Sequence, residues 1–213
     1  MSHLVNPTAP SVPIVYIVDD DDGVRESLRW LVESAGRPTE TFRNAQDFLN
    51  GYDKGRPGCV ILDIRMPVMG GFELQDELAK VNSALPIIFI TGHGDVSMSV
   101  RAMKNGAMNF IEKPYNYQQM LDSIQASLKI GVATFEKRRR QQDYAARLSQ
   151  LSPREHMVLE KVVEGKSSKQ IALELGISAK TVEVHRTNIR NKLHTDSVAQ
   201  LIKIVMIAAG KDY

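Results

Sequence analysis

Short apolar runs alternate with segments of helical periodicity through the first 130 residues. The runs that are typical of strands are Ile14–Val18, Thr39–Phe42, Cys59–Leu62, Ile87–Ile90 and Asn109–Ile111. Three of these runs are almost wholly apolar, which indicates strands that are buried on both faces. The regular alternation of strand and helix predicts a parallel sheet with helices on both sides.

Apolar positions between these runs recur at steps of three and four residues, the spacing of one helix face. The sets are Val24, Leu28, Leu31 and Val32; Phe72, Leu74, Leu78 and Val81; and, more weakly, Val100, Met103 and Ala107. We expect each set to form the apolar face of an amphipathic helix.

From Tyr117 onward the pattern is helical only. One apolar stripe comprises Tyr117, Leu121, Ile124, Leu128, Val132 and Phe135. Gly131 weakens a helix by about 1 kcal/mol relative to Ala without forbidding it. We therefore predict that a first domain, residues 12–130, ends in a helix that continues as a helical linker over 131–148. A flexible linker is the alternative.

A second domain, residues 149–213, begins near Ser152. Ser152, Pro153 and Glu155 have the spacing of a capping box with proline at the first helical position. Four helices are expected, at about 153–164, 168–175, 179–192 and 196–208, with no strand after Ile111. The order of short helix, tight turn and longer helix is that of a helix-turn-helix, which places its second helix in the major groove of DNA.

Composition and charge are those of an ordinary globular protein, with 43% hydrophobic and 24% charged residues. Residues 1–11 are expected to be a disordered tail rather than a secretory signal. No apolar stretch is long enough for a membrane span. The single cysteine, Cys59, excludes an intramolecular disulfide and is interpreted as a buried core thiol rather than a redox site, consistent with a cytoplasmic location.

The charge is unevenly distributed between the two domains. Residues 1–130 carry a net charge of −4 and residues 131–213 a net charge of +6. A basic second part suits a polyanionic partner, although chance variation alone could give this asymmetry.

Polar side chains follow several of the predicted strands. Asp19 and Asp20 follow the first strand and Asp63 the third, and the carboxyl ends of parallel strands meet at one edge of a sheet. Three converging carboxylates need a cation, and Mg²⁺ prefers such oxygen ligands. Thr91 and Lys113 end the fourth and fifth strands, where a hydroxyl and an ammonium group suit phosphate oxygens.

Four motifs in these positions resemble a response-regulator receiver domain: residues 17–20 (IVDD), 62–71 (LDIRMPVMGG), 90–95 (ITGHGD) and 110–114 (FIEKP). The resemblance implies a flavodoxin-like sheet of order 2-1-3-4-5, with Asp63 as phosphoacceptor and Asp19 and Asp20 as an acidic pair. It further implies that Mg²⁺ (or Mn²⁺) is held by these carboxylates and the Arg65 carbonyl. Thr91 and Lys113 would bind the phosphoryl group, and Phe110 would be the aromatic switch residue.

Helix geometry of about 100° per residue divides the third helix of the second domain into two sides. Val182, Ile189 and Leu193 form the expected buried side. The expected base-facing residues are Lys180, Thr181, Glu183, Val184, Thr187 and Asn191. The candidate phosphate contacts are Lys166, Lys169, His185, Arg186, Arg190 and Lys192. An outward valine suits a thymine methyl group, whereas phosphate contacts position the protein without reading sequence.

Residues 151–155 (LSPRE), 169–172 (KQIA) and 177–186 (ISAKTVEVHR) resemble a LuxR/NarL-type helix-turn-helix. Together with the receiver motifs they resemble the FixJ type of response regulator. This implies phosphorylation by a sensor histidine kinase, homodimerisation, promoter DNA binding and transcription activation through RNA polymerase, without a membrane partner. The basic run at 137–140 belongs to neither motif and is interpreted as a solvated helix face rather than an extra DNA contact.

Two other functional classes remain open from the sequence. One is a metal-dependent phosphatase, which would turn over small phosphate esters many times, whereas a receiver catalyses only its own phosphorylation and dephosphorylation. The other is a constitutive DNA-binding protein with a vestigial receiver. The complete set of Asp19, Asp20, Asp63, Thr91 and Lys113 argues against the second.

Overall fold

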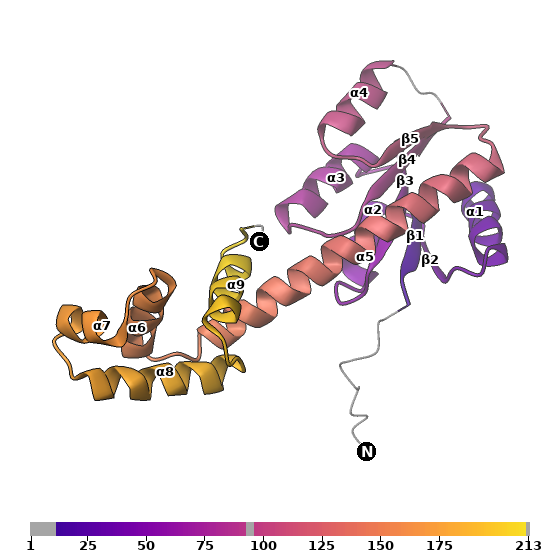
Figure 1. The fold of residues 1–213 in the computed structure, drawn as a ribbon. Coiled ribbons are helices and arrows are strands. Elements are labelled where there is room, and N and C mark those ends of the chain that lie inside the picture. The colour runs from indigo at the N-terminus through magenta and orange to yellow at the C-terminus, as the bar shows by residue number, and fades with distance from the viewer. Residues whose placement is uncertain (1–11, 93–95, 212–213) are drawn as a thin grey trace. The chain divides into compact units, whose positions relative to one another are not determined.

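The computed structural model describes residues 12–92 and 96–211 (Figure 1). The tail expected at 1–11, and His93 to Asp95 of the fourth-strand motif, lie outside the described residues. The chain divides into two compact units, residues 1–135 and 136–213.

The first unit contains a five-stranded parallel sheet of order β2-β1-β3-β4-β5, which confirms the predicted topology. The strands are β1 (Ile14–Val18), β2 (Thr39–Phe42), β3 (Gly58–Asp63), β4 (Ile87–Thr91) and β5 (Asn109–Glu112). Every residue of β1, β3 and β4 is buried, because these central strands are covered on both faces.

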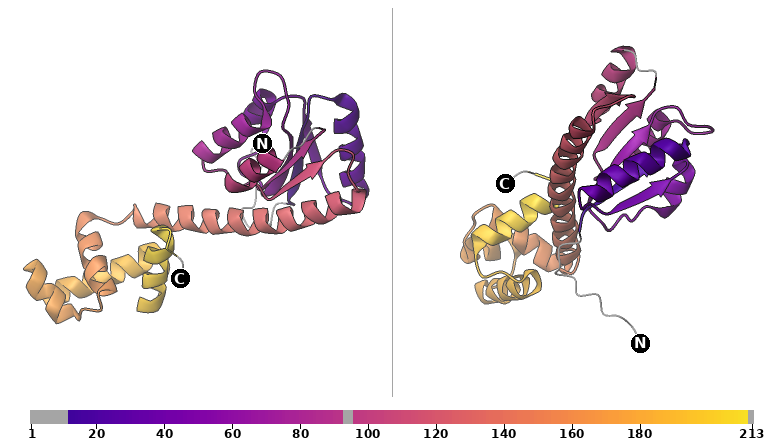
Figure 2. Two further views of the ribbon diagram at one scale, coloured as in Figure 1. Left: turned by 90° about the horizontal axis from the view of Figure 1, so that it is seen from above. Right: turned by 90° about the vertical axis from the view of Figure 1, so that its right-hand side faces the viewer.

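Helices cover both faces of this sheet, as the alternation of strand and helix predicts (Figures 1 and 2). The helices are α1 (Asp22–Ser34), α2 (Ala45–Gly51), α3 (Gly71–Lys80), α4 (Val96–Lys104) and α5 (Tyr117–Leu148). One core cluster joins α2, α3 and α4 to the sheet, and a second joins α1 and α5 to its other face. No apolar stripe singled out α2 in the sequence, since it has only seven residues.

The apolar stripe predicted for α4 is wrong. Val100 and Met103 are 45% and 50% exposed, whereas Ala102 is fully buried. Met98 is half-buried and packs against the core on the same side as Ala102. The small Ala102 side chain lets the helix approach the sheet closely, so the larger residues point outward.

Two other predicted apolar positions are also exposed. Val81 lies at the C-cap of α3 and is 57% exposed, and Tyr117 begins α5 and is 62% exposed. Both stand at helix ends, beyond the turns that contact the sheet.

Helix α5 runs without a break over its 32 residues. Its buried face combines the large Met120, Ile124 and Leu128 with small residues, among them Gly131. A Cβ atom on Gly131 would overlap the backbone carbonyl oxygen of Gly58, at the start of β3. Glycine is therefore required by a close approach of helix to strand.

The second unit consists of the end of α5, from residue 136, and four further helices. These are α6 (Pro153–Val163), α7 (Ser168–Leu175), α8 (Ala179–Leu193) and α9 (Val198–Ala208), close to the predicted ranges. The predicted capping box at Ser152 and Glu155 is present, and Gly176 ends α7 with a φ of 65°. Tyr144 and Leu148 of α5 pack against the core of this unit.

Among the described helices, none combines the length and hydropathy that crossing a membrane would require.

Candidate functional site

An acidic pocket lies at the carboxyl edge of the sheet. Asp63 is the last residue of β3, and Asp19 directly follows β1. The two strands are parallel neighbours in which Val18 pairs with Leu62, so the two aspartates leave the sheet side by side. Carboxylate oxygens of Asp19, Asp20 and Asp63 lie within 4.8 Å of one another. Asp19 and Asp63 are only 1% and 6% exposed, whereas Asp20 is open to solvent.

Lys113 brings a positive charge into this pocket from the residue after β5. Its Nζ lies 2.8 Å from Asp19 Oδ2 and 3.2 Å from Asp63 Oδ1. The backbone amide of Lys113 also donates to the carbonyl of Thr91, at 2.7 Å, and this hydrogen bond joins the ends of β4 and β5. The peptide bond between Lys113 and Pro114 is cis.

The electrostatics of the pocket favour a cation. Burial raises the pKa of Asp63 and the charge of Asp19 raises it further, while Lys113 acts in the opposite direction. Burial would lower the pKa of Lys113, but its hydrogen bonds and charge interactions with Asp19 and Asp63 outweigh burial and raise it. Lys113 is therefore an ammonium ion at neutral pH.

Backbone and side-chain donors orient the two buried carboxylates. Asp19 Oδ1 accepts from the Asp21 amide at 2.9 Å, and Asp63 Oδ2 accepts from the Arg65 amide at 3.1 Å. Arg25 donates to the carbonyl of Asp19 at 2.7 Å and also pairs with Asp22. Sequence reasoning missed Arg25, because no motif marks a residue one turn into α1.

The donor set suits a hard divalent cation. Asp19, Asp20 and Asp63 offer converging carboxylate oxygens, and Lys113 alone does not balance three negative charges. Mg²⁺ takes one or two carboxylates, keeps several waters and accepts phosphate oxygens. The residues present therefore fit the predicted Mg²⁺.

The other two predicted switch residues lie on the neighbouring strands. Thr91 ends β4 at the same carboxyl edge of the sheet and is 1% exposed. Phe110 lies in β5, is half-buried and packs against the core cluster that includes α3 and α4.

Helix α8 of the second unit has the two sides expected from its sequence. Val182, Ile189 and Leu193 are buried. The six predicted base-facing residues, Lys180, Thr181, Glu183, Val184, Thr187 and Asn191, are all exposed. Val184 is 54% exposed, an unusual position for valine on a surface that only water contacts. Glu183 is hydrogen-bonded to Ser168 of α7.

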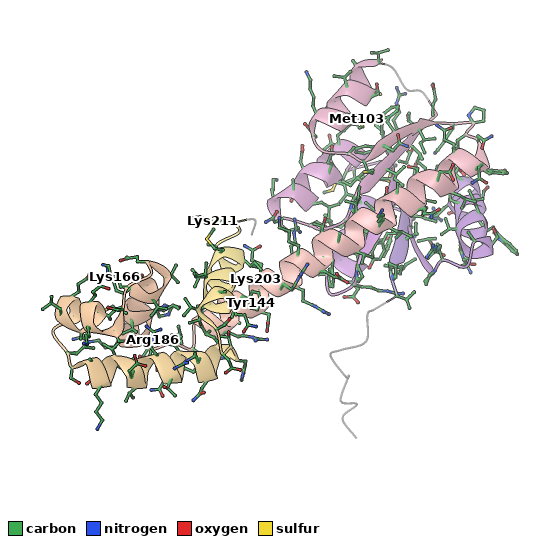
Figure 3. All side chains as sticks on the ribbon, viewed as in Figure 1. Met103, Tyr144, Lys166, Arg186, Lys203 and Lys211 are labelled. Carbon is green, nitrogen blue, oxygen red and sulfur yellow. The ribbon has the colours of Figure 1, made fainter. Side chains whose placement is uncertain are left out.

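The predicted phosphate contacts fall into two groups. Lys169 is exposed, and His185, Arg186 and Arg190 of α8 are half-buried. Figure 3 labels Arg186 in this unit. Lys166 and Lys192, in contrast, have acidic partners. Lys166 Nζ lies 2.9 Å from Glu164 and 2.6 Å from Glu174, and Lys192 Nζ lies 2.7 Å from Glu155.

Comparison with known families matches both units. The model of the response regulator receiver domain matches residues 15–125. The model of bacterial regulatory proteins of the luxR family matches residues 149–205.

Individual relatives match over nearly the whole chain. The response regulator protein TodT of Pseudomonas putida is 42% identical over 191 residues, which cover 90% of this chain and 84% of that protein. The transcriptional regulatory protein FixJ of Bradyrhizobium diazoefficiens is 39% identical over 194 residues, covering 91% and 95%. The solved structure of the response regulator StyR is 45% identical with a TM-score of 0.81, covering 92% and 98%. The chain therefore belongs to the two-component response regulators, as a transcriptional regulator with a receiver domain and a LuxR-family DNA-binding domain.

Proposed function

We propose that this regulator is switched on by phosphorylation of Asp63 and then activates transcription as a dimer. The observation that carries the proposal is the shared contact of Lys113 with Asp19 and Asp63, in a pocket where carboxylate oxygens converge. The proposed partners are a sensor histidine kinase, promoter DNA and RNA polymerase, in the cytoplasm.

In the proposed reaction a carboxylate oxygen of Asp63 attacks the phosphorus of a phosphohistidine on the kinase. The new O–P bond forms as the N–P bond breaks, and the imidazole leaves with the bond's electron pair. Mg²⁺, held by Asp19, Asp20, Asp63 and the Arg65 carbonyl, would neutralise charge on the phosphoryl oxygens. Asp19 keeps Lys113 at the pocket, 2.8 Å from its own carboxylate, where the ammonium group can bind a phosphoryl oxygen. The chain catalyses only this transfer and the later hydrolysis of the acyl phosphate, in which water takes the phosphoryl group and the Asp63 carboxylate is restored.

The phosphoryl group would reorganise the residues beside it. A phosphorylated side chain carries roughly −1.5 to −2 charges near neutral pH. That charge draws Lys113 and the Thr91 hydroxyl towards the phosphoryl oxygens, and Phe110 repacks between β5 and α4. The change at Asp63 is thereby carried to the outer side of α4.

Exposed apolar side chains on the outer side of α4 support dimerisation as the result of phosphorylation. Val96, Val100 and Met103 are 80%, 45% and 50% exposed and follow one another at steps of four and three residues. They form an apolar stripe on one helix face, on which Figure 3 labels Met103. A second copy of the receiver would cover this stripe and bring two α8 helices to two DNA half-sites.

The proposed DNA contacts follow the exposed side of α8. Lys180, Thr181, Glu183, Val184, Thr187 and Asn191 would face base edges. Lys169, His185, Arg186 and Arg190 would contact phosphates. Lys166 remains a weaker proposal, because Glu164 and Glu174 already neutralise it.

The experiment compares the unmodified chain with Asp63→Asn in the presence of a small phosphate donor and Mg²⁺. We expect the donor to increase dimer formation and DNA affinity of the unmodified chain and to change neither in Asp63→Asn. Asp76→Asn, on the exposed side of α3, is the matched control and should respond normally. Equal stimulation of Asp63→Asn would contradict the proposal. Repeated turnover of a small phosphate ester would instead favour a phosphatase.

A further inference from the structure

Lys192 is the one predicted phosphate contact whose charge is held by a buried acid. Its Nζ lies 2.7 Å from Glu155 Oε2 and donates to the carbonyl of Gln150 at 3.2 Å. Glu155 is only 4% exposed. Its Oε2 also accepts from the backbone amide of Ser152 at 2.7 Å, as part of the capping box that begins α6.

The buried carboxylate determines what Lys192 can do. The Lys192 side chain is 38% exposed, whereas that of Glu155 is 5% exposed. Turning the ammonium group away would leave the buried carboxylate without its counter-charge, which disfavours the separated state. If Lys192 turned outward to a DNA phosphate, the Glu155 carboxylate would lose its counter-charge and keep the backbone amide of Ser152 as a donor. Lys169 is exposed, and no ion pair to it is found among the described residues. Lys169 can therefore contact a DNA phosphate without leaving an acidic partner unpaired.

The same pair joins the recognition helix to the start of the domain. Lys192 lies in the last turn of α8, between exposed Asn191 and buried Leu193. Glu155 lies in the first turn of α6, and Gln150 in the connection that precedes it. One ammonium group therefore ties the end of α8 to two points at the beginning of the domain.

On the basis of the proposed function, in which α8 enters the DNA groove, we propose that Lys192 is a positioning residue for sequence reading and does not neutralise a phosphate. Its bonds to Glu155 and Gln150 set the rotation of α8 about its own axis. That rotation in turn sets where Thr187 and Asn191 meet the base edges.

Salt dependence separates the two roles. Each phosphate contact contributes about 0.9 to the slope of log affinity against log salt concentration on duplex DNA. The probes are a random-sequence duplex and a duplex enriched from a random pool by the unmodified full chain, with a phosphate donor and Mg²⁺ present. The variants are Lys192→Met, Lys192→Arg, Glu155→Gln and, as a phosphate-contact comparison, Lys169→Met. Glu155→Gln retains a capping box, since glutamine also serves at that position, and thus tests the ion pair in a folded domain.

We expect Lys192→Met and Glu155→Gln to lower affinity for the enriched duplex about tenfold, the size of one misread base pair. Both variants should leave affinity for the random duplex and the salt slope unchanged, and Lys192→Arg should restore specific binding. Lys169→Met should lower the slope by about 0.9.

Two results would overturn the proposal. One is a slope lowered by about 0.9 in Lys192→Met. The other is tighter binding of both duplexes by Glu155→Gln, as expected if removing an acid merely freed a phosphate-binding lysine. Failure of the unmodified chain to enrich any duplex would be a different result, and it would contradict the proposed function itself.

Discussion

Lys113 Nζ lies 3.2 Å from Asp63 Oδ1 while it also holds Asp19 at 2.8 Å, so two buried carboxylates share a single ammonium group. Lys113 is the residue after β5, Asp19 is the residue after β1, and Asp63 is the last residue of β3. Asp63, the proposed phosphoacceptor, is thus held in a site with an excess of negative charge, and this has a measurable effect on stability.

We expect Asp63→Asn to make the receiver more stable than the unmodified chain at pH 7 without divalent ions. Burial and the charge of Asp19 raise the pKa of Asp63, so its ionised form is less favourable in the folded than in the unfolded state. The unmodified receiver therefore loses stability as pH rises from the ordinary aspartate pKa, about 3.9, through the raised folded value.

Thermal denaturation between pH 4 and pH 8 measures this difference. The advantage of Asp63→Asn, a few degrees in Tm at neutral pH, should shrink towards the acid end of the range. Asp76→Asn is the control and should be neutral, since Asp76 is exposed. A less stable Asp63→Asn at neutral pH would show that Lys113 compensates the buried charge fully.

Gly131→Ala should destabilise the receiver, against the usual effect of this substitution. In a helix interior Ala is ordinarily favoured over Gly by about 1 kcal/mol. At residue 131 the added Cβ would overlap the carbonyl oxygen of Gly58, a backbone atom that cannot turn aside. Overpacking of this kind costs about 1–3 kcal/mol, which outweighs the gain in helix propensity. Urea denaturation checks the sign, and Gly92→Ala, with no described atom within 4 Å of the added Cβ, is the control.

Val68→Asn should stabilise the receiver by about 1 kcal/mol, because a β-branched residue is strained in the left-handed region whereas Asn tolerates it. Val68 has a φ of 70° and is fully exposed, and the Met69 amide donates to the carbonyl of Pro67 at 2.8 Å across it. Thermal denaturation tests this expectation. Val81→Asn is the matched control, at an exposed residue with a φ of −87°, and should change little. Equal effects of the two variants would mean that exposure rather than backbone strain matters.

Val100→Asp should prevent phosphorylation-dependent dimerisation and leave the monomer folded. Val100 is 45% exposed and lies between Val96 and Met103 in the apolar stripe of α4, so a charge there meets solvent in the monomer and an apolar surface in the proposed dimer. Light scattering with and without a phosphate donor gives the oligomeric state. Val81→Asp, at the C-cap of α3, should still dimerise. If both variants dimerise normally, another face is used.

A fragment of residues 149–213 should be less stable than one of residues 136–213 by about 2 kcal/mol, the value of burying parts of two large side chains. The shorter fragment lacks Tyr144 and Leu148, which pack against the core of the second unit. Thermal denaturation of both fragments provides the comparison. Equal stability would assign the end of α5 to a linker, as the sequence alone suggested.

The sequence by itself determined the central strands and the acidic residues of the pocket, while the order of the strands came from the resemblance to receiver domains. The apolar run Cys59–Leu62 is typical of a central strand, and Asp63 directly after this run is expected at the carboxyl edge of the sheet. The buried and exposed sides of α8 could also be predicted from the sequence. A helix of 15 residues contains about four turns, enough for its periodicity to be recognised.

Only the tertiary structure decided which side of α4 is buried and what partner Lys192 has. A helix of nine residues holds too few periods to distinguish Val100 from Ala102, and contact with the sheet favoured the small side chain. Lys192 and Glu155 are separated by 37 residues, so their ion pair exists only after α6 and α8 have packed. Local periodicity follows from the chain alone, whereas contacts between distant residues depend on how the helices and the sheet pack together.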